Sequence, residues 1–215
     1  MSIHRASQNL PMASPVPEVW RTSEEPMVSV IVPLASGEAE PKDLIALLPQ
    51  DFEIILARGG TRATSMNEAA VIAKGRYLWF IHADTILAPD AVRALQRRLP
   101  REDAILYFDL HFDAGLLMRL TELGVRFRSR VLGLPFGDQA LCLSRDTFSM
   151  LGAYDECTIH GEDHLLVRKA HRAGIAVEPV GATLVTSARK YRRNGWFRTT
   201  WLHLCLTLRQ TVQPL

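Results

Sequence analysis

Three short, largely apolar segments, each followed at once by proline or polar residues, constrain the fold most strongly. They are Val28–Val32, Glu53–Ala57 and Tyr77–Ile81. Apolar runs of this length without polar alternation are typical of strands that are buried on both faces. Helical patterns separate them, such as the one over Ser65–Lys74. Buried strands that alternate with helices predict an α/β fold with a mostly parallel central sheet flanked by helices.

The same patterns continue along the chain. They predict short helices at 43–48 and from Pro89, a half-exposed strand at 105–112, a helix with a basic face at 116–131, a short strand at 140–143, a helix at 162–173, extended chain at 177 and 183–186, and an apolar helix at 196–211. Residues 1–27 hold four prolines and no periodicity, so we expect a flexible tail and one domain over 28–215.

Composition narrows the class of protein and its compartment. The chain has 215 residues, of which 47% are hydrophobic and 22% charged, and these values exclude a wholly disordered or fibrous protein. Its three cysteines form no CxxC motif, which favours a reducing compartment. We see no signal peptide and no run long enough to span a membrane, so we expect a cytoplasmic protein, with peripheral binding to the inner membrane face as an option.

The charge of the chain is unevenly distributed. Residues 164–215 hold nine Lys or Arg against the single acid Glu178, whereas the net charge of the whole chain is +2. A basic C-terminal quarter favours an anionic partner such as a phosphate, a nucleotide or a lipid headgroup. No sequence motif for nucleic-acid binding accompanies it, so we expect no nucleic acid partner.

Asp84 follows a buried strand directly. Ligands of open α/β sheets bind at the carboxyl ends of the strands, and one carboxylate there can hold Mg²⁺ or Mn²⁺ together with substrate phosphates. The competing interpretation is that Asp84 or Thr85 caps the following turn. The neighbouring His82, like His164 beside the next acidic motif, is more often structural than a metal ligand.

Two adjacent acids, Glu162 and Asp163, open the helix predicted at 162–173. The helix dipole stabilises acids at this position, so a purely structural role is sufficient to explain them. The functional interpretation is that one of them is a general base for an acceptor hydroxyl. Consecutive helical residues point about 100° apart, so we expect only one of the two to face the site.

Two further segments carry polar or basic groups. Gly137, Asp138 and Gln139 form a turn whose side chains can hydrogen-bond hydroxyl groups. Residues 187–193 hold four basic side chains, which suit a diphosphate, an anionic lipid or plain solvent exposure. The apolar residues at 196–208 fit an interfacial helix, a dimer contact or packing on the domain.

Taken in order, these motifs resemble a family 2 glycosyltransferase of the GT-A fold. The segments that carry the resemblance are the strand ending at Pro33, Thr61-Arg62-Ala63-x-x-Met66-Asn67, His82-Ala83-Asp84-Thr85, Gly137-Asp138-Gln139, Glu162-Asp163 and Thr186-Ser187-Ala188-Arg189. More narrowly, the chain resembles the short bacterial subgroup called radical-SAM/selenodomain-associated transferase 2. The resemblance covers about residues 28–210.

The resemblance implies an inverting transferase that uses a nucleotide-diphospho sugar, a divalent metal (Mn²⁺ or Mg²⁺) and a hydroxyl acceptor. It implies metal and donor binding by Asp84 and general-base catalysis by Asp163. It further implies donor contacts from Pro33, Arg62, Asn67, Arg189 and Arg193, and acceptor-side positions at Gly137, Asp138, Gln139 and Glu162.

One segment departs from the family pattern. Family members usually carry an acidic turn, a helix and a strand between the second strand and the Arg-Ala motif, whereas here Arg58-Gly59-Gly60 leads directly to Thr61. We therefore expect a truncated nucleotide-binding half. The alternative function is a non-catalytic, glycosyltransferase-like binding or membrane-associated protein with a degenerate donor pocket.

Overall fold

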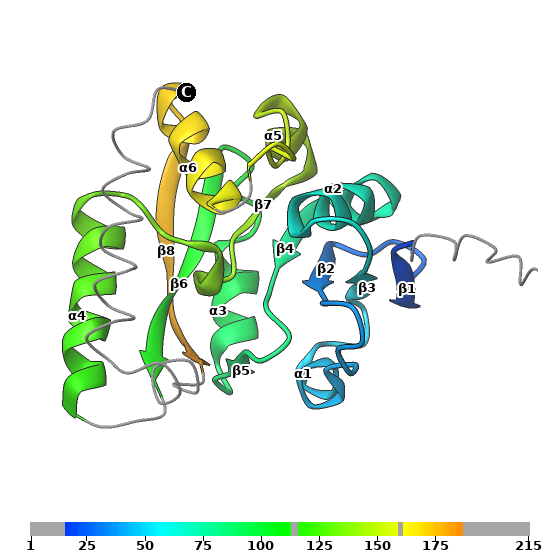
Figure 1. The fold of residues 1–215 in the computed structure, drawn as a ribbon, viewed down its shortest axis with the longest axis horizontal. Coiled ribbons are helices and arrows are strands. Elements are labelled where there is room, and N and C mark those ends of the chain that lie inside the picture. The colour runs from blue at the N-terminus through cyan, green and yellow to red at the C-terminus, as the bar shows by residue number, and fades with distance from the viewer. Residues whose placement is uncertain (1–15, 113–115, 159–160, 187–215) are drawn as a thin grey trace, which may run out of the picture.

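A computed structural model describes residues 16–112, 116–158 and 161–186 (Figure 1). An eight-stranded sheet lies at its centre, in the order β1-β3-β2-β4-β7-β6-β8-β5. The strands are β1 (Glu18–Arg21), β2 (Val28–Pro33), β3 (Glu53–Ala57), β4 (Tyr77–Phe80), β5 (Ile86–Leu87), β6 (Ala104–Phe112), β7 (Cys142–Ser144) and β8 (Ala176–Thr186). The helices are α1 (Lys42–Leu47), α2 (Arg62–Ile72), α3 (Ala91–Arg98), α4 (Leu116–Val131), the 3₁₀ turn η1 (Gly137–Gln139), α5 (Arg145–Met150) and α6 (Glu162–Arg172).

The direction of the strands brings the functional motifs to one edge of the sheet. β2, β3, β4, β6 and β8 run one way, and β1, β5 and β7 run the other. The carboxyl ends of the main set therefore meet at one edge. Because β7 is reversed, the turn η1 just before it lies at that same edge, and α6, which returns to β8, begins there. The predicted α/β class with a mostly parallel sheet is confirmed.

Helices cover both faces of the sheet, which explains the continuous apolar strands. In one core, α1 and α3 pack against one face of the sheet, which includes Val30 and Trp79. In the other, α2, α5 and α6 pack against the opposite face, which includes Ile31 and Phe80. The expectation that 105–112 is half-exposed is wrong, because every β6 residue except His111 is buried. Its polar Asp109 is accommodated by Arg130 of α4, whose Nη2 donates to Oδ2 at 2.6 Å.

Several predicted boundaries move. The segment Glu18–Arg21 forms β1 and pairs antiparallel with β3, so the ordered domain begins before Val28 and residues 16–27 do not belong to a flexible tail. The helix expected from Ser65 begins at Arg62, because Thr61 is the N-cap and its hydroxyl accepts from the backbone N–H of Thr64. Residues 1–15 and the helix expected at 196–211 lie outside the described residues. Within the described part, no helix is both long enough and apolar enough to cross a bilayer.

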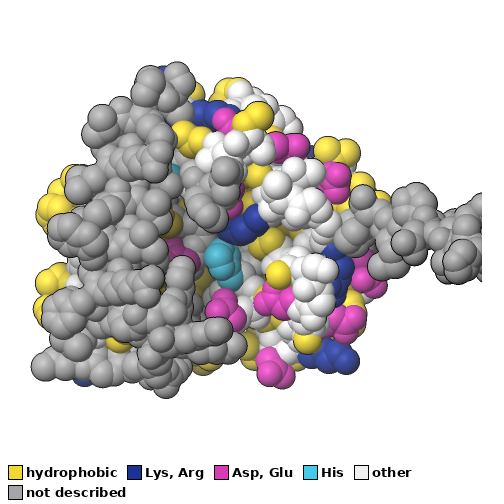
Figure 2. All heavy atoms as spheres, in the orientation of Figure 1, with side chains coloured by type: hydrophobic (Ala, Val, Ile, Leu, Met, Phe, Trp, Pro, Cys, Tyr) yellow, Lys and Arg dark blue, Asp and Glu magenta, His cyan; other side chains and the backbone are white. Residues whose placement is uncertain are grey.

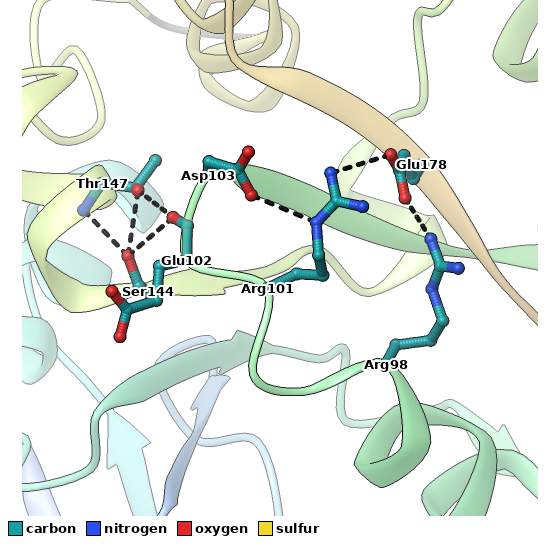
Figure 3. Close-up of polar contacts among 7 residues, drawn as sticks. All are labelled: Arg98, Arg101, Glu102, Asp103, Ser144, Thr147 and Glu178. Carbon is teal, nitrogen blue, oxygen red and sulfur yellow. Dashed lines mark hydrogen bonds and ion pairs between the residues drawn. The ribbon is translucent and has the colours of Figure 1, made fainter.

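An ion network ties the opposite edge of the sheet together (Figure 3). Glu178 of β8 accepts from Arg98 at the end of α3 and, at 3.1 Å, from Nη2 of Arg101. Arg101 also pairs with Asp103, which directly precedes β6. The amino ends of β6 and β8 are thus fastened to α3, away from the edge that carries the functional motifs.

A buried polar contact joins β2, β3 and the turn before β4. Oε2 of Glu53 accepts from the hydroxyl of Ser29 and from the backbone N–H of Lys74, the latter at 2.8 Å. The Ser29 hydroxyl in turn accepts from the backbone N–H of Gly75 at 2.8 Å. A Cβ on Gly75 would overlap the backbone of Ser29, so this close approach requires glycine.

We predict that Gly75→Ala lowers the free energy of unfolding by about 2 kcal/mol, the usual cost of overpacking a rigid interior. Gly124→Ala is the matched control, because its Cβ would point into open space within α4. That change should stabilise by up to about 1 kcal/mol through helix propensity. Urea unfolding followed by circular dichroism measures both, and equal effects would contradict the assigned contact.

Candidate active site

A cleft of about 810 Å³ opens at the edge where the main strands end. It is lined by the segment after β2 (Pro33 to Glu38), by the β3–α2 connection (Arg58 to Arg62) with Ser65, and by His82, Ala83 and Asp84 after β4. Figure 2 shows a histidine together with basic and acidic side chains near the centre of this face. Pro33, Arg62 and Asp84, expected at the donor, therefore share one cavity.

Asp84 lines this cleft. It is exposed and, among the residues that the structure describes, makes no hydrogen bond or ion pair. The capping interpretation of Asp84 and Thr85 is wrong, since the next helix, α3, begins at Ala91 with Asp90 at its N-cap. An uncommitted carboxylate at the ligand edge is available to a cation or a substrate.

The acid pair at the start of α6 is buried, and both carboxylates are paired with one guanidinium. Nη1 of Arg62, from α2, donates to Oδ2 of Asp163 at 2.7 Å and also to Oε1 of Glu162. Arg62 reaches across the start of α6 and contacts both acids, so this contact does not distinguish them, and the expectation that only one of the two faces the site stays a prediction. Figure 1 shows α2 and α6 on the same side of the sheet.

Electrostatics in this cluster follow from burial and charge. Burial alone would lower the pKa of Arg62, but the charges of Asp163 and Glu162 outweigh it and raise that pKa. Burial, together with the positive charge of Arg62, lowers the pKa of His82. A neutral His82 accepts at Nε2 from Nη2 of Arg62, 2.7 Å away, which places its own proton on Nδ1.

The Gly137-Asp138-Gln139 turn packs against the candidate base. A Cβ on Gly137 would overlap the carboxylate of Asp163, so only glycine allows this approach. Asp138 is partly buried, and its Oδ1 has no hydrogen-bond partner among the described residues. The turn thus places an unsatisfied acceptor close to Asp163 and His82.

Gln139 has a different role from the expected acceptor contact. It is 1% exposed, and its side-chain oxygen accepts from Ser129, Arg128 and the backbone N–H of Phe136. Its amide nitrogen donates to the carbonyl of Phe108 at 2.9 Å. Gln139 therefore fixes the turn to α4 and β6, and we correct its assignment from acceptor binding to positioning.

Asn67 also lies away from the expected donor contact, since it does not line the cleft. Its amide group donates to the carbonyl of Tyr154 at 2.9 Å and accepts from the N–H of the same residue at 3.1 Å. It therefore clamps the segment between α5 and α6 to α2. Arg189 and Arg193, expected near the diphosphate, lie outside the described residues.

Sequence reasoning missed the link between Arg62 and the acid pair, and missed Tyr154 altogether. Residues 62 and 163 lie 101 positions apart, and no local spacing relates them. The sequence signal was indirect: two adjacent acids were expected at a helix start near the site, and Arg62 was expected as a donor contact, but nothing in the sequence paired them.

The fit of a divalent metal can be judged from the donor atoms. No group of three or more His, Cys, Asp or Glu side chains within the described ranges is arranged around one point. Nε2 of His82 is already used by Arg62. Asp84 remains, and one carboxylate is enough for Mg²⁺ or Mn²⁺ when substrate phosphates and water supply the other ligands. The residues present fit an ion that binds together with a diphosphate.

We predict that Arg62→Gln lowers the free energy of unfolding at pH 7 by about 2 kcal/mol, because two buried carboxylates lose their cation. The value is below that of a fully buried pair because the Arg62 side chain is 31% exposed.

Arg76→Gln is the control for that experiment, because Arg76 pairs with Glu102 at an exposed position. Its effect should stay within about 0.5 kcal/mol. Denaturant unfolding of both variants at pH 7 measures the difference. A deficit in Arg62→Gln no larger than that in Arg76→Gln would contradict the charge argument.

Comparisons with known proteins place this geometry in a family. The family model described as "Glycosyl transferase family 2" matches residues 39–147, just over half of the chain. A search of curated proteins finds no significant match.

Solved structures share the fold at low sequence identity. A mannosyltransferase from Pyrobaculum calidifontis, in complex with GDP-Man and Mn²⁺, matches with a TM-score of 0.59 and 16% identity over 86% of this chain and 63% of its own. TarS 1–349 from S. aureus matches with a TM-score of 0.56 and 13% identity over 75% of this chain and 60% of its own. Its complex with UDP-GlcNAc matches with a TM-score of 0.52 and 12% identity, over 75% of this chain and 58% of its own.

This chain therefore spans less than two thirds of the length of these structures, and the likeness concerns the fold. Together with the family model, it shows that the chain belongs to glycosyltransferase family 2 and has a GT-A-like fold.

Proposed function

We propose that this protein transfers a sugar from a nucleotide-diphospho sugar to an acceptor hydroxyl, with inversion at the anomeric carbon and with the help of a divalent metal. The observation that carries the proposal is the juxtaposition of a buried carboxylate, paired with Arg62, and a large cleft that is lined by an exposed one. Asp163 forms an ion pair with Arg62 and packs closely against Gly137. Arg62 itself lines the cleft, as does Asp84.

Asp163 is the proposed general base. Its carboxylate takes the proton of the acceptor hydroxyl while the acceptor oxygen forms a bond to the anomeric carbon. The bond from that carbon to the diphosphate oxygen breaks, and its electron pair leaves with the diphosphate. One displacement inverts the anomeric centre and needs no protein nucleophile.

The cleft supplies the donor side of the reaction. Asp84 would hold a divalent ion together with the phosphate oxygens, and such an ion would offset the charge that develops on the leaving diphosphate. Arg62 adds a fixed positive charge at the inner wall. The solved structures with GDP-Man and Mn²⁺ and with UDP-GlcNAc support a nucleotide-sugar donor.

Other sequence expectations remain proposals. Arg189 and Arg193 would contact the diphosphate, and Asp138 would accept from the sugar or from the acceptor hydroxyl through its unsatisfied Oδ1. The His82-Ala83-Asp84-Thr85 and Gly137-Asp138-Gln139 motifs support the narrower radical-SAM/selenodomain-associated subgroup. Residues 196–211 would bind an anionic membrane surface or a second copy.

We predict that UDP-GlcNAc or GDP-mannose raises the melting temperature by about 5 °C or more when millimolar donor far exceeds its Kd and Mn²⁺ or Mg²⁺ is present. Removing the metal with EDTA, or changing Asp84→Ala, should abolish that shift. Asp90→Ala removes an exposed acid outside the cleft and should leave the shift intact. No shift with a wider panel of nucleotide sugars would favour the non-catalytic alternative.

We predict that Asp163→Asn lowers sugar transfer on the order of 10²-fold or more, the usual contribution of a general base. Donor binding by calorimetry should stay intact, because Asp84 and Arg62 remain in the cleft. Glu162→Gln is the comparison variant, since Glu162 shares the guanidinium but is not in contact with Gly137. We expect Glu162→Gln to lower sugar transfer less than Asp163→Asn does. Full activity of Asp163→Asn would show that Asp163 is not the base.

A further inference from the structure

Tyr154 lies between α5 and α6 and is held from two sides. Its ring is 2% exposed and packs edge-on against Phe80 at 5.0 Å and against Phe148 at 5.3 Å between centroids. Its backbone N–H and carbonyl are both bound by the side chain of Asn67. The direction of the Tyr154 hydroxyl is therefore set by rigid neighbours.

Two buried polar atoms at this place have no partner. Neither the hydroxyl of Tyr154 nor Oδ1 of Asp163 makes a hydrogen bond among the described residues. The other carboxylate oxygen, Oδ2, is already bound by Arg62. A buried hydroxyl without a partner costs free energy that phenylalanine would avoid while packing equally well, so the hydroxyl calls for an explanation.

The two atoms are complementary. Burial raises the pKa of Tyr154 and the negative charge of Asp163 raises it further, so the hydroxyl stays protonated and can donate. An ionised carboxylate only accepts. Both residues are also held against the same helix, because Asn67 of α2 binds the backbone of Tyr154 and Arg62 of α2 binds Asp163. Phe80, against which the Tyr154 ring packs, directly precedes the Ile81–Asp84 segment.

Resting on the proposed function, we propose that Tyr154 is a positioning residue that donates a hydrogen bond to Oδ1 of Asp163. With Arg62 on Oδ2, this bond fixes the plane of the carboxylate toward the acceptor hydroxyl. Oδ1 retains a second lone pair for the proton it takes. Asn67 acts one step further out, because it holds the backbone of Tyr154.

The effect of the Tyr154 hydrogen bond depends on the charged groups around Asp163. Arg62 from α2 and Glu162 from α6 contact the cluster directly, and His82 after β4 and Asp138 of η1 contribute to its field. Tyr154 is a neutral donor among them. Its hydrogen bond favours the ionised carboxylate, so its loss should make the base require a higher pH to be active.

The test is Tyr154→Phe, which keeps the ring and removes the hydroxyl. The readout is release of UDP from UDP-GlcNAc with water as acceptor, or of GDP from GDP-mannose if that is the donor that stabilises the protein. We predict that kcat falls roughly 10-fold to 100-fold, the range for a hydrogen bond to a charged group, while KM stays within about twofold. The acidic limb of the pH–rate profile should move to higher pH.

Tyr77→Phe is the matched control. Tyr77 is equally buried, and its hydroxyl also lacks a partner among the described residues, but it lies at the amino end of β4, away from the cleft. It should leave kcat and the pH profile unchanged. If Tyr154→Phe behaves like Tyr77→Phe, the proposal is overturned.

A second measurement does not need catalysis, so its outcome separates this inference from the proposed function. In tyrosine-labelled protein, a buried hydroxyl proton that is hydrogen-bonded exchanges slowly and gives an NMR resonance. The resonance of Tyr107, whose hydroxyl donates to the carbonyl of Ser129 at 3.1 Å, is the internal reference. A second resonance should disappear in Tyr154→Phe and shift in Asp163→Asn. A Tyr154 resonance that Asp163→Asn does not move would refute the contact even in an inactive protein.

Discussion

The arrangement of this site depends on one guanidinium that pairs with two buried carboxylates. Glu162 and Asp163 are each less than a tenth exposed, and burial of two adjacent negative charges at a helix start is costly without a cation. Arg62 supplies that cation from a different helix, and its second amino group is bound to His82. Three segments that are distant in the sequence, α2, the turn after β4 and α6, are thereby fixed relative to one another before any ligand arrives.

The reversed strand β7 gives this site its second half. In a sheet of parallel strands alone, every connection that enters a strand does so at the far edge. Because β7 runs against β4 and β6, the turn η1 enters it at the ligand edge, next to the start of α6. The sheet therefore presents donor-side residues from the ends of β2, β3 and β4 and acceptor-side residues from the turn before β7.

Much of this fold can be predicted from the sequence, because burial on both faces leaves a strong local pattern in β2, β3 and β4. The pattern fails in β6, where the polar Asp109 imitates the alternation of a half-exposed strand although it is buried and paired with Arg130. Asp84 and the acid pair were identifiable from their positions after a strand and at a helix start. The contacts of Arg62, Tyr154 and Gln139 were not, because each joins residues whose distance in sequence carries no periodic signal.

Contact between Gly137 and Asp163 also decides which acid can act at this position. With the carboxylate already against the glycine backbone, the additional methylene of a glutamate would have no space to occupy without moving η1. The short side chain of Asp163 and the absence of a side chain at residue 137 are therefore both needed for this close contact. A homologous protein with a larger residue in this turn would need a shorter reach from α6 or a displaced turn, so the two positions have to change together.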